Sequence, residues 1–246
     1  MADFAYEATR VIDRLKRQNI DRDSRMRAVN LVRTGHSDMV FKGLFPSDWP
    51  KPVVGNFIDV VARDSAEMIG VLPTLTAAGD TVLDESKRSR QDKLTKIINY
   101  HAYASKLGTY LISGADRMGT YGFVPLRVEA NYEDGRPHIH VDDSLNTYYL
   151  KDRWNNVTLY ARIFWKKVSE LVELFPEHAA QIVQNTGYNN NSDELLELVH
   201  YYDNDKCMLF VPKRNGLILS QYTNPLGRIP VAIAELPSLD GVARGA

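Results

Sequence analysis

The sequence predicts an α+β fold in which long helices pack on a β-rich module. Apolar residues recur every three or four positions over most of residues 3–118, which is typical of helices. At Tyr121 the apolar period changes to two, which is typical of half-buried strands. Helical and strand patterns occupy separate halves of the chain, and this arrangement favours an α+β fold over one with alternating helices and strands.

Four helices are expected in the first part of the chain. Their ranges are 3–19, 22–33, a third opened by Pro52 and reaching Pro73, and a long one from Ser86 towards Met118. Gly35 is expected to end the second helix, because glycine readily adopts the left-handed conformation of a helix cap. Gly108 and Gly114 are expected to bend the long helix. The histidine on its apolar face, His101, is expected to be a hydrogen-bonded core residue.

The second part of the chain is expected to form an antiparallel meander. The clearest strand covers 157–166, where apolar and polar residues alternate. Turns are predicted at Glu133-Asp134-Gly135 and at Asn215-Gly216, a strong hairpin signal. Further strands are expected over 123–130, 196–202, 208–211 and 217–222, with a helical insertion at 169–184. The expected domains are therefore a helical part over 1–120, a β-rich module over 121–236, and residues 237–246 leading towards a further region.

Composition excludes several classes of protein. The 246 residues are 44% hydrophobic and 25% charged, as in an ordinary soluble globular protein. A net charge of −1 argues against a domain that grips duplex DNA, which is usually strongly basic. The single cysteine, Cys207, excludes an internal disulfide framework. No run approaches the ~18–20 apolar residues of a membrane span, and no signal-peptide pattern opens the sequence, so we expect synthesis in a cytoplasm.

Charge is unevenly distributed along the chain. Residues 87–127 contain eight basic and two acidic residues, whereas residues 128–206 contain seven basic and fourteen acidic ones. Such a distribution suits contacts between unlike surfaces of neighbouring subunits, because complementary potentials steer docking and fix register. The alternative is that a helical surface and a sheet surface simply differ in charge.

Motifs for catalysis are scarce, and we expect neither an enzyme nor a cofactor. The glycines of the segment from Gly114 to Thr120 are spaced as in a phosphate-binding loop, but the segment lacks the lysine that reaches the phosphates. We expect them instead to let a helix end and turn into the sheet. His138, His140 and Asp142 could project from one strand face as half of a metal site. The alternative is an exposed strand whose polar face binds nothing.

Aromatic residues cluster in the β-rich half. Alternation along strands requires some of them to point away from the core, so they are expected to serve either the core or an interface. The residues concerned are Tyr148, Tyr149, Trp154, Tyr160, Phe164, Trp165, Tyr201 and Tyr202. Cys207 lies in a predicted strand and is expected to be a small buried apolar residue.

Three stretches carry a resemblance to a known family. The first is the proline- and tryptophan-rich loop and helix start at 43–64, which opens Gly43-Leu-Phe-Pro-Ser-Asp-Trp-Pro-Lys-Pro52. The second comprises Tyr121-Gly-Phe, Arg136-Pro-His-Ile-His-Val, Tyr160-Ala-Arg-Ile-Phe-Trp-Lys-Lys and Glu170-Leu-Val-Glu-Leu-Phe-Pro. The third is Asn224-Pro-Leu-Gly-Arg-Ile-Pro-Val. In this order they resemble the N-terminal, wing-containing part of the portal proteins of tailed bacteriophages, especially phages of actinobacteria.

The resemblance implies a structural role in the virion. A portal protein forms a ring, normally a dodecamer, at one vertex of the capsid. Double-stranded DNA passes through the ring during packaging and ejection. Its partners would be the major capsid protein, the terminase large subunit and the head-tail adaptor, with no membrane involved. The ring would assemble in the host cytoplasm.

One departure from the portal pattern affects the channel. Portal proteins continue into stem, clip and tunnel-loop segments, of which residues 237–246 would be only the start, so no DNA-contacting residue is carried over. Lys87, Arg88 and Arg90 are the candidate inter-subunit contacts. Two alternatives remain: another head-tail connector or adaptor protein, and a metal-dependent hydrolase using His138, His140 and Asp142.

Overall fold

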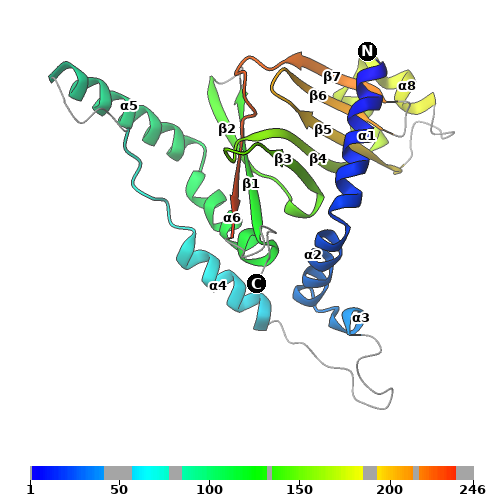
Figure 1. Ribbon diagram of the computed structural model, residues 1–246, viewed down its shortest axis with the longest axis horizontal. Helices are drawn as coiled ribbons and strands as arrows, with labels where there is room; N and C mark the ends of the chain where they lie inside the picture. The colour runs from blue at the N-terminus through cyan, green and yellow to red at the C-terminus, as the bar shows by residue number, and fades with distance from the viewer. Residues whose placement is uncertain are drawn as a thin grey trace. The chain divides into compact units, whose positions relative to one another are not determined.

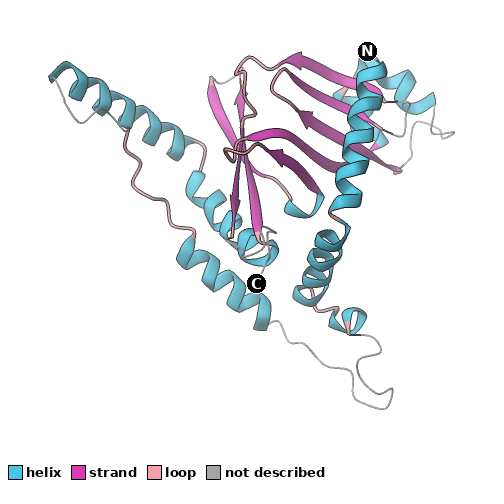
Figure 2. Cartoon of the chain, viewed as in Figure 1, coloured by secondary structure: helices cyan, strands magenta, loops and turns pink. Residues whose placement is uncertain are grey.

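The computed structural model describes residues 2–41, 57–77, 85–131, 135–184, 193–212 and 216–236 (Figures 1 and 2). The chain divides into two compact units. Unit 1 comprises Met1–Ser24 and Leu145–Val231, and unit 2 comprises Arg25–Ser144 and Ala232–Ala246. Helices and antiparallel sheets are both present, so the predicted α+β fold with a β-rich module is confirmed.

Unit 1 is built on a five-stranded antiparallel sheet. Its strands follow the chain order β3-β4-β5-β6-β7, which confirms the predicted meander. The bounds are Thr147–Lys151 for β3, Val157–Lys167 for β4, Leu195–Tyr202 for β5, Lys206–Val211 for β6 and Leu217–Thr223 for β7. Between β4 and β5 the chain forms the expected helical insertion: α7 (Val168–Leu174), the 3₁₀ turn Pro176–His178 and α8 (Ala179–Gln184).

Both faces of this sheet are covered by helices of the same unit. Helix α1 (Ala2–Gln18) packs on one face, where it contacts β3 and β7 (Figure 1). Its buried residues Ala5, Ala8, Ile12 and Leu15 recur every three or four positions and join a core that includes Tyr201, Met208 and Phe210. On the opposite face, α7 and α8 bury Leu171 and Ile182 against Leu198. Burying each such aliphatic side chain contributes about 1.5–3 kcal/mol.

A buried polar cluster fixes the start of α2 (Ile20–Arg33) on β3. Arg22 donates hydrogen bonds to Asp23 Oδ1 from Nε (2.9 Å) and Nη2 (2.8 Å), and to the Thr147 carbonyl (3.2 Å). The Tyr148 hydroxyl donates to Asp23 Oδ2 at 2.6 Å. Each charged group therefore has a partner of opposite charge or a hydrogen bond, as burial requires.

Unit 2 combines helices with a three-stranded sheet in the order β2-β1-β8. The strands are β1 (Phe123–Asn131), β2 (Arg136–Val141) and β8 (Val231–Glu235). Helix α6 packs against α4 and β1. The helices, besides the second part of α2, are α3 (Ser37–Val40), α4 (Phe57–Ile69), α5 (Glu85–Ala104) and α6 (Leu107–Tyr121). Of the 3₁₀ turn Ser144–Asn146, only Ser144 belongs to unit 2.

The long helix expected over residues 86–118 is two helices. The break lies at Lys106, whose φ of 54° is left-handed, and not at Gly108 or Gly114. The turn from α6 into β1 likewise occurs at Gly122 (φ 85°), whose N–H donates to the Met118 carbonyl at 2.8 Å. The expectation that Gly114 and Gly119 make this turn is wrong, because both lie within α6.

Compact units and predicted domains follow different boundaries. The expected division at residues 120 and 121 marks the change from helix to strand, whereas the units are delimited after Ser24, Ser144 and Val231. The proline-rich loop at 43–52, the turn residues 133–134 and Asn215, and the stem-leading residues 237–246 lie outside the described residues. Within the described part of the chain, no helix combines the length and apolar character needed to cross a membrane.

Candidate functional site

The predicted histidine pair lies on β2, but Asp142 does not join it. His138 and His140 share a strand face as expected, with ring centroids 6.2 Å apart. Asp142 is 2% exposed and is bound by Arg127, whose Nε donates to Oδ2 at 2.7 Å and whose Nη2 donates to Oδ1 at 3.3 Å. Among the residues that the structure describes, no three His, Cys, Asp or Glu side chains are placed to hold a metal ion.

The surroundings of His140 favour the neutral form of its imidazole. Burial lowers the pKa of the imidazole below its ordinary value, and the nearby Arg127 lowers it further, whereas Glu129 and Asp142 oppose the shift. His140 Nε2 lies 3.7 Å from Glu129 Oε2. The strand therefore presents a neutral imidazole near pH 7, beside an acidic side chain on the neighbouring strand.

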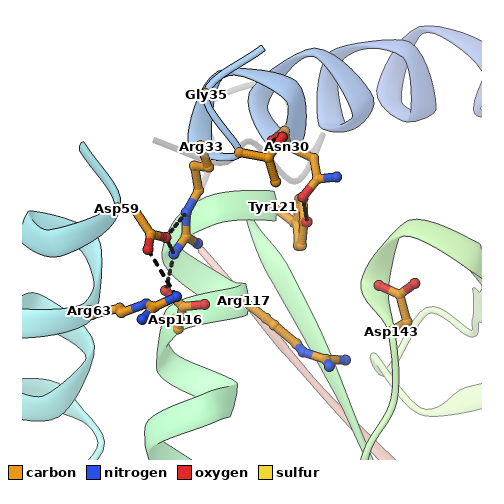
Figure 3. Close-up of a pocket in the computed structure, with 10 residues that line it drawn as sticks. Asn30, Arg33, Gly35, Asp59, Arg63, Asp116, Arg117, Tyr121 and Asp143 are labelled. Carbon is orange, nitrogen blue, oxygen red and sulfur yellow. Dashed lines mark hydrogen bonds and ion pairs between the residues drawn. The ribbon is translucent and has the colours of Figure 1, made fainter. Parts of the chain in front are cut away.

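A polar cleft of about 640 Å³ opens in unit 2 (Figure 3). Helices α2, α4 and α6 supply most of its walls, with Asp143 from the segment after β2. Its lining is almost entirely polar: Asn30, Arg33, Thr34, Gly35, Asp59, Arg63, Asp116, Arg117, Tyr121 and Asp143.

Arg33 of α2 lines the polar cleft and links this helix to α4 and α6. Its Nε and Nη2 donate to Asp59 Oδ1 of α4 at 3.2 and 2.7 Å. Nη2 lies 2.9 Å from Asp116 Oδ1 of α6, and Nη1 donates to the Thr120 hydroxyl. Burial disfavours the charged guanidinium, but Asp116 and Asp59 outweigh burial and raise the pKa of Arg33 above its usual range. Arg63 closes the network with an ion pair to Asp59 Oδ2 at 2.9 Å.

The far side of the polar cleft is also hydrogen-bonded. Arg117 Nη1 donates to the Asp142 carbonyl at 2.7 Å, and the Tyr121 hydroxyl donates to Asn30 Oδ1 at 3.1 Å. Burial and then Asp143 raise the pKa of Tyr121, against the opposing charges of Arg33 and Arg117. The cleft therefore holds paired carboxylates, charged guanidinium groups and a neutral phenol. Arg33, Asp59, Asp116 and Arg63 form an ion-pair network that joins α2, α4 and α6.

Helix α5 exposes several large apolar side chains among charged ones, whereas its polar residues Thr95 and Asn99 face its own unit. Thr95 and Asn99 face the segment 71–77: the Ala77 amide donates to Thr95 Oγ1 at 3.0 Å, and Asn99 Nδ2 donates to the Leu75 carbonyl at 3.1 Å. The exposed side includes Leu94 (43% exposed) and Ile97 (52%), together with Ile98, Tyr100 and Tyr103. We call Leu94, Ile97, Ile98, Tyr100 and Tyr103 the α5 apolar face. Figure 1 shows the first half of α5 projecting beyond the other elements of unit 2.

The predicted inter-subunit residues lie on the same helix. Arg88 and Arg90 are exposed, and the side chain of Lys87 lies outside the described residues. Helix α4 of the same unit also exposes apolar side chains, at Val60, Val61, Met68 and Ile69. His101 is half-buried, and its Nδ1 has no hydrogen-bond partner among the described residues, so the prediction of a hydrogen-bonded core histidine is wrong at this atom.

The aromatic cluster divides between core and surface. Tyr148, Tyr160, Tyr201 and Tyr202 are buried, whereas Trp154 and Trp165 are exposed. Cys207 is buried in β6, as predicted.

The sequence did not indicate that the apolar residues of α5 are exposed. Those residues have the spacing of a core-facing stripe, and only the fold shows which side of the helix is covered.

Searches of protein-family models and of curated protein sequences return no match to this chain. The candidate functional surfaces are therefore those that the geometry distinguishes: the polar cleft, which is crossed by the ion pairs of Arg33, and the α5 apolar face, whose side chains are exposed.

Proposed function

We propose that this chain is a structural subunit of a bacteriophage portal ring, located at the capsid vertex through which DNA is packaged and ejected. The resemblance of three ordered stretches to portal proteins supports the proposal. The observation that carries it is the α5 apolar face, since a surface of this kind indicates a protein that assembles. The proposal includes no catalytic role and no cofactor.

The physical argument begins with the cost of exposing apolar side chains to water. Fully burying a leucine or isoleucine side chain contributes about 1.5–3 kcal/mol, and five large side chains remain exposed along α5. The polar side chains that α5 turns inward make hydrogen bonds to the segment 71–77, so the orientation of the helix is defined. A second copy of the chain would cover the apolar side without disturbing those bonds.

Electrostatics are compatible with the same role. Each phosphate that a protein neutralises adds affinity for DNA, and a ring through which DNA slides needs weak binding. A net charge of −1 gives the chain no overall attraction for DNA. The basic segment 87–127 and the acidic segment 128–206 instead suit contacts between copies.

The proposed partners follow from this position in the virion. They are further copies of the chain, the major capsid protein, the terminase large subunit and the head-tail adaptor, with double-stranded DNA passing through the ring. Another head-tail connector protein is the second candidate, because the α5 apolar face supports ring assembly of either kind. Binding of a terminase large subunit would favour the portal, since an adaptor joins after packaging.

The proposal can be tested by measuring the mass of the particles that the chain forms and by imaging their shape. Light scattering and negative-stain microscopy of the full chain should show rings. The triple variant Lys87→Glu, Arg88→Glu, Arg90→Glu should lower the particle mass, because it reverses the charge at the start of the basic segment 87–127. A matched triple variant on exposed positions of α1, Arg10→Glu, Arg14→Glu, Arg17→Glu, should leave the rings intact. A wild-type chain that stays monomeric at all concentrations would contradict the proposal.

A further inference from the structure

The outer side of α7 in unit 1 is acidic around an apolar centre. Glu170, Glu173 and Leu174 are exposed and lie three and four positions apart, so they share one side of the helix. Leu174 is 59% exposed, and Glu177 follows in the 3₁₀ turn after α7. Glu170 pairs with Lys166 at 3.0 Å, whereas Glu173 and Glu177 form no ion pair with any described residue. We call Glu170, Glu173, Leu174 and Glu177 the α7 acidic face.

Helix α5 carries the complementary pattern. Arg90, Lys93, Leu94 and Ile97 occupy positions i, i+3, i+4 and i+7 and are all exposed. Within the part of the chain that the structure describes, neither Arg90 nor Lys93 forms an ion pair. One surface therefore offers unpaired cations beside aliphatic side chains, and the other offers unpaired carboxylates beside a leucine.

We propose that the basic and apolar side of α5 in one copy docks on the α7 acidic face of the next copy. This inference rests on the proposed function, because it identifies the surfaces that would close the portal ring. The two surfaces belong to different helices of the chain, so the contact is head-to-tail, and a head-to-tail contact generates a ring when the rotation closes. In the ring, α5 of each copy would contact α7 of one neighbour, and α7 of the same copy would contact α5 of the other neighbour.

Apolar and charged groups have separate roles in this contact. Leu94, Ile97 and Leu174 would lose their exposure to water and provide most of the affinity. The charges around them would remain partly solvated, where ion pairs add little affinity but steer the encounter and fix the register. Charge reversal on one side should therefore oppose assembly, and reversal on both sides should restore it.

Two reversal variants and their combination test the contact. Arg90→Glu with Lys93→Glu, or Glu173→Lys with Glu177→Lys, should each weaken association at least tenfold by light scattering across a concentration series. The combined chain with all four changes should recover the mass of wild type. Glu7→Lys with Asp13→Lys, two exposed acidic positions on α1, is the matched control and should assemble normally. Circular dichroism melts check that each variant is folded.

Crosslinking gives an independent readout. With dissolved oxygen and a copper catalyst as oxidant, a chain carrying Arg90→Cys mixed with a chain carrying Glu173→Cys should form a disulfide between copies, whereas Arg90→Cys with Glu7→Cys should not. If wild type forms rings, neither reversal weakens them and the cysteine variants yield no crosslink, this contact is overturned and the portal proposal stands. A monomeric wild type would overturn both.

Discussion

Gly70, the residue after α4, packs directly against the backbone of α6 at Ile112. A Cβ atom at position 70 would lie 2.5 Å from Ile112 Cα and 2.7 Å from Ile112 N, which are backbone atoms that cannot rotate away. We predict that Gly70→Ala destabilises the protein by about 1–3 kcal/mol in urea unfolding, through overpacking. Gly108→Ala is the control: its Cβ would have Leu72 Cβ as nearest neighbour at 4.0 Å, so it should gain up to about 1 kcal/mol. Equal effects of the two changes would contradict the close approach.

Tyr201 makes stability depend on pH at alkaline values. Burial, with a smaller effect of Asp203, raises the pKa of Tyr201 to about 12, against about 10 for an unfolded tyrosine. Because the folded state holds this proton more tightly, its stabilisation is fully present below pH 10 and is lost as the pH rises towards 12. Urea unfolding from pH 8 to 11.5 should show wild type losing more stability than Tyr201→Phe. Parallel curves for the two proteins would contradict the raised pKa.

Tyr148 is expected to stabilise unit 1 through its hydroxyl. Tyr148→Phe removes the donor to Asp23 Oδ2 and leaves a buried carboxylate oxygen with one bond fewer, at a cost of about 1–3 kcal/mol. Tyr6→Phe, at an exposed position, should change the free energy of unfolding by less than about 0.5 kcal/mol. Chemical denaturation of both variants provides the comparison, and a Tyr148→Phe protein as stable as wild type would show that the bond adds nothing.

The contacts of Asp142 show that the sequence indicates which residues share a strand face but not which distant residues form ion pairs. Strand periodicity correctly placed His138 and His140 on one face. The ion pair between Arg127 and Asp142 depends on the way β1 and β2 pair and on the turn of the chain after β2, neither of which follows from local spacing. The same holds for Arg33, whose partners Asp59 and Asp116 lie far away in the sequence.

Substitutions on the exposed side of α5 are expected to weaken assembly without destabilising the fold of the single chain. We predict that Ile97→Gln weakens self-association, because it places an amide at the proposed contact. The free energy of unfolding of the dissociated chain should change by less than about 0.5 kcal/mol, since the side chain is 52% exposed. Leu171→Ala, at a 1% exposed position in unit 1, should instead cost about 2–5 kcal/mol. An Ile97→Gln chain that loses stability like Leu171→Ala would mean that α5 belongs to the monomer core.

Strong local patterns allowed most elements to be predicted. The alternation over residues 157–166 corresponds to β4, and the helix that ends before Gly35 corresponds to α2. The break at Lys106 escaped prediction because neither Ser105 nor Lys106 is a typical helix breaker. Strands β3 and β8 were not predicted from the sequence. Each is only five residues long, and β8 contains two alanines, which have low strand propensity.

At the scale of the whole molecule, the sequence predicted the fold class but not the division of the chain into two compact units. The change of apolar period indicates helices followed by strands, and the α+β fold follows from that order. Unit 1, however, joins α1 to strands that begin more than a hundred residues later. Periodicity describes which side of a segment is apolar but carries no information on which distant segment covers it, and α5 shows the same limit.

The particle mass of the wild-type chain tests ring assembly most directly. One chain has a mass of 27.9 kDa. Light scattering of the purified chain over a concentration series, with negative-stain images of the same sample, should give a mass many times that of one chain and ring-shaped particles. A constant mass equal to one chain, with no rings in the images, would contradict the proposed portal function.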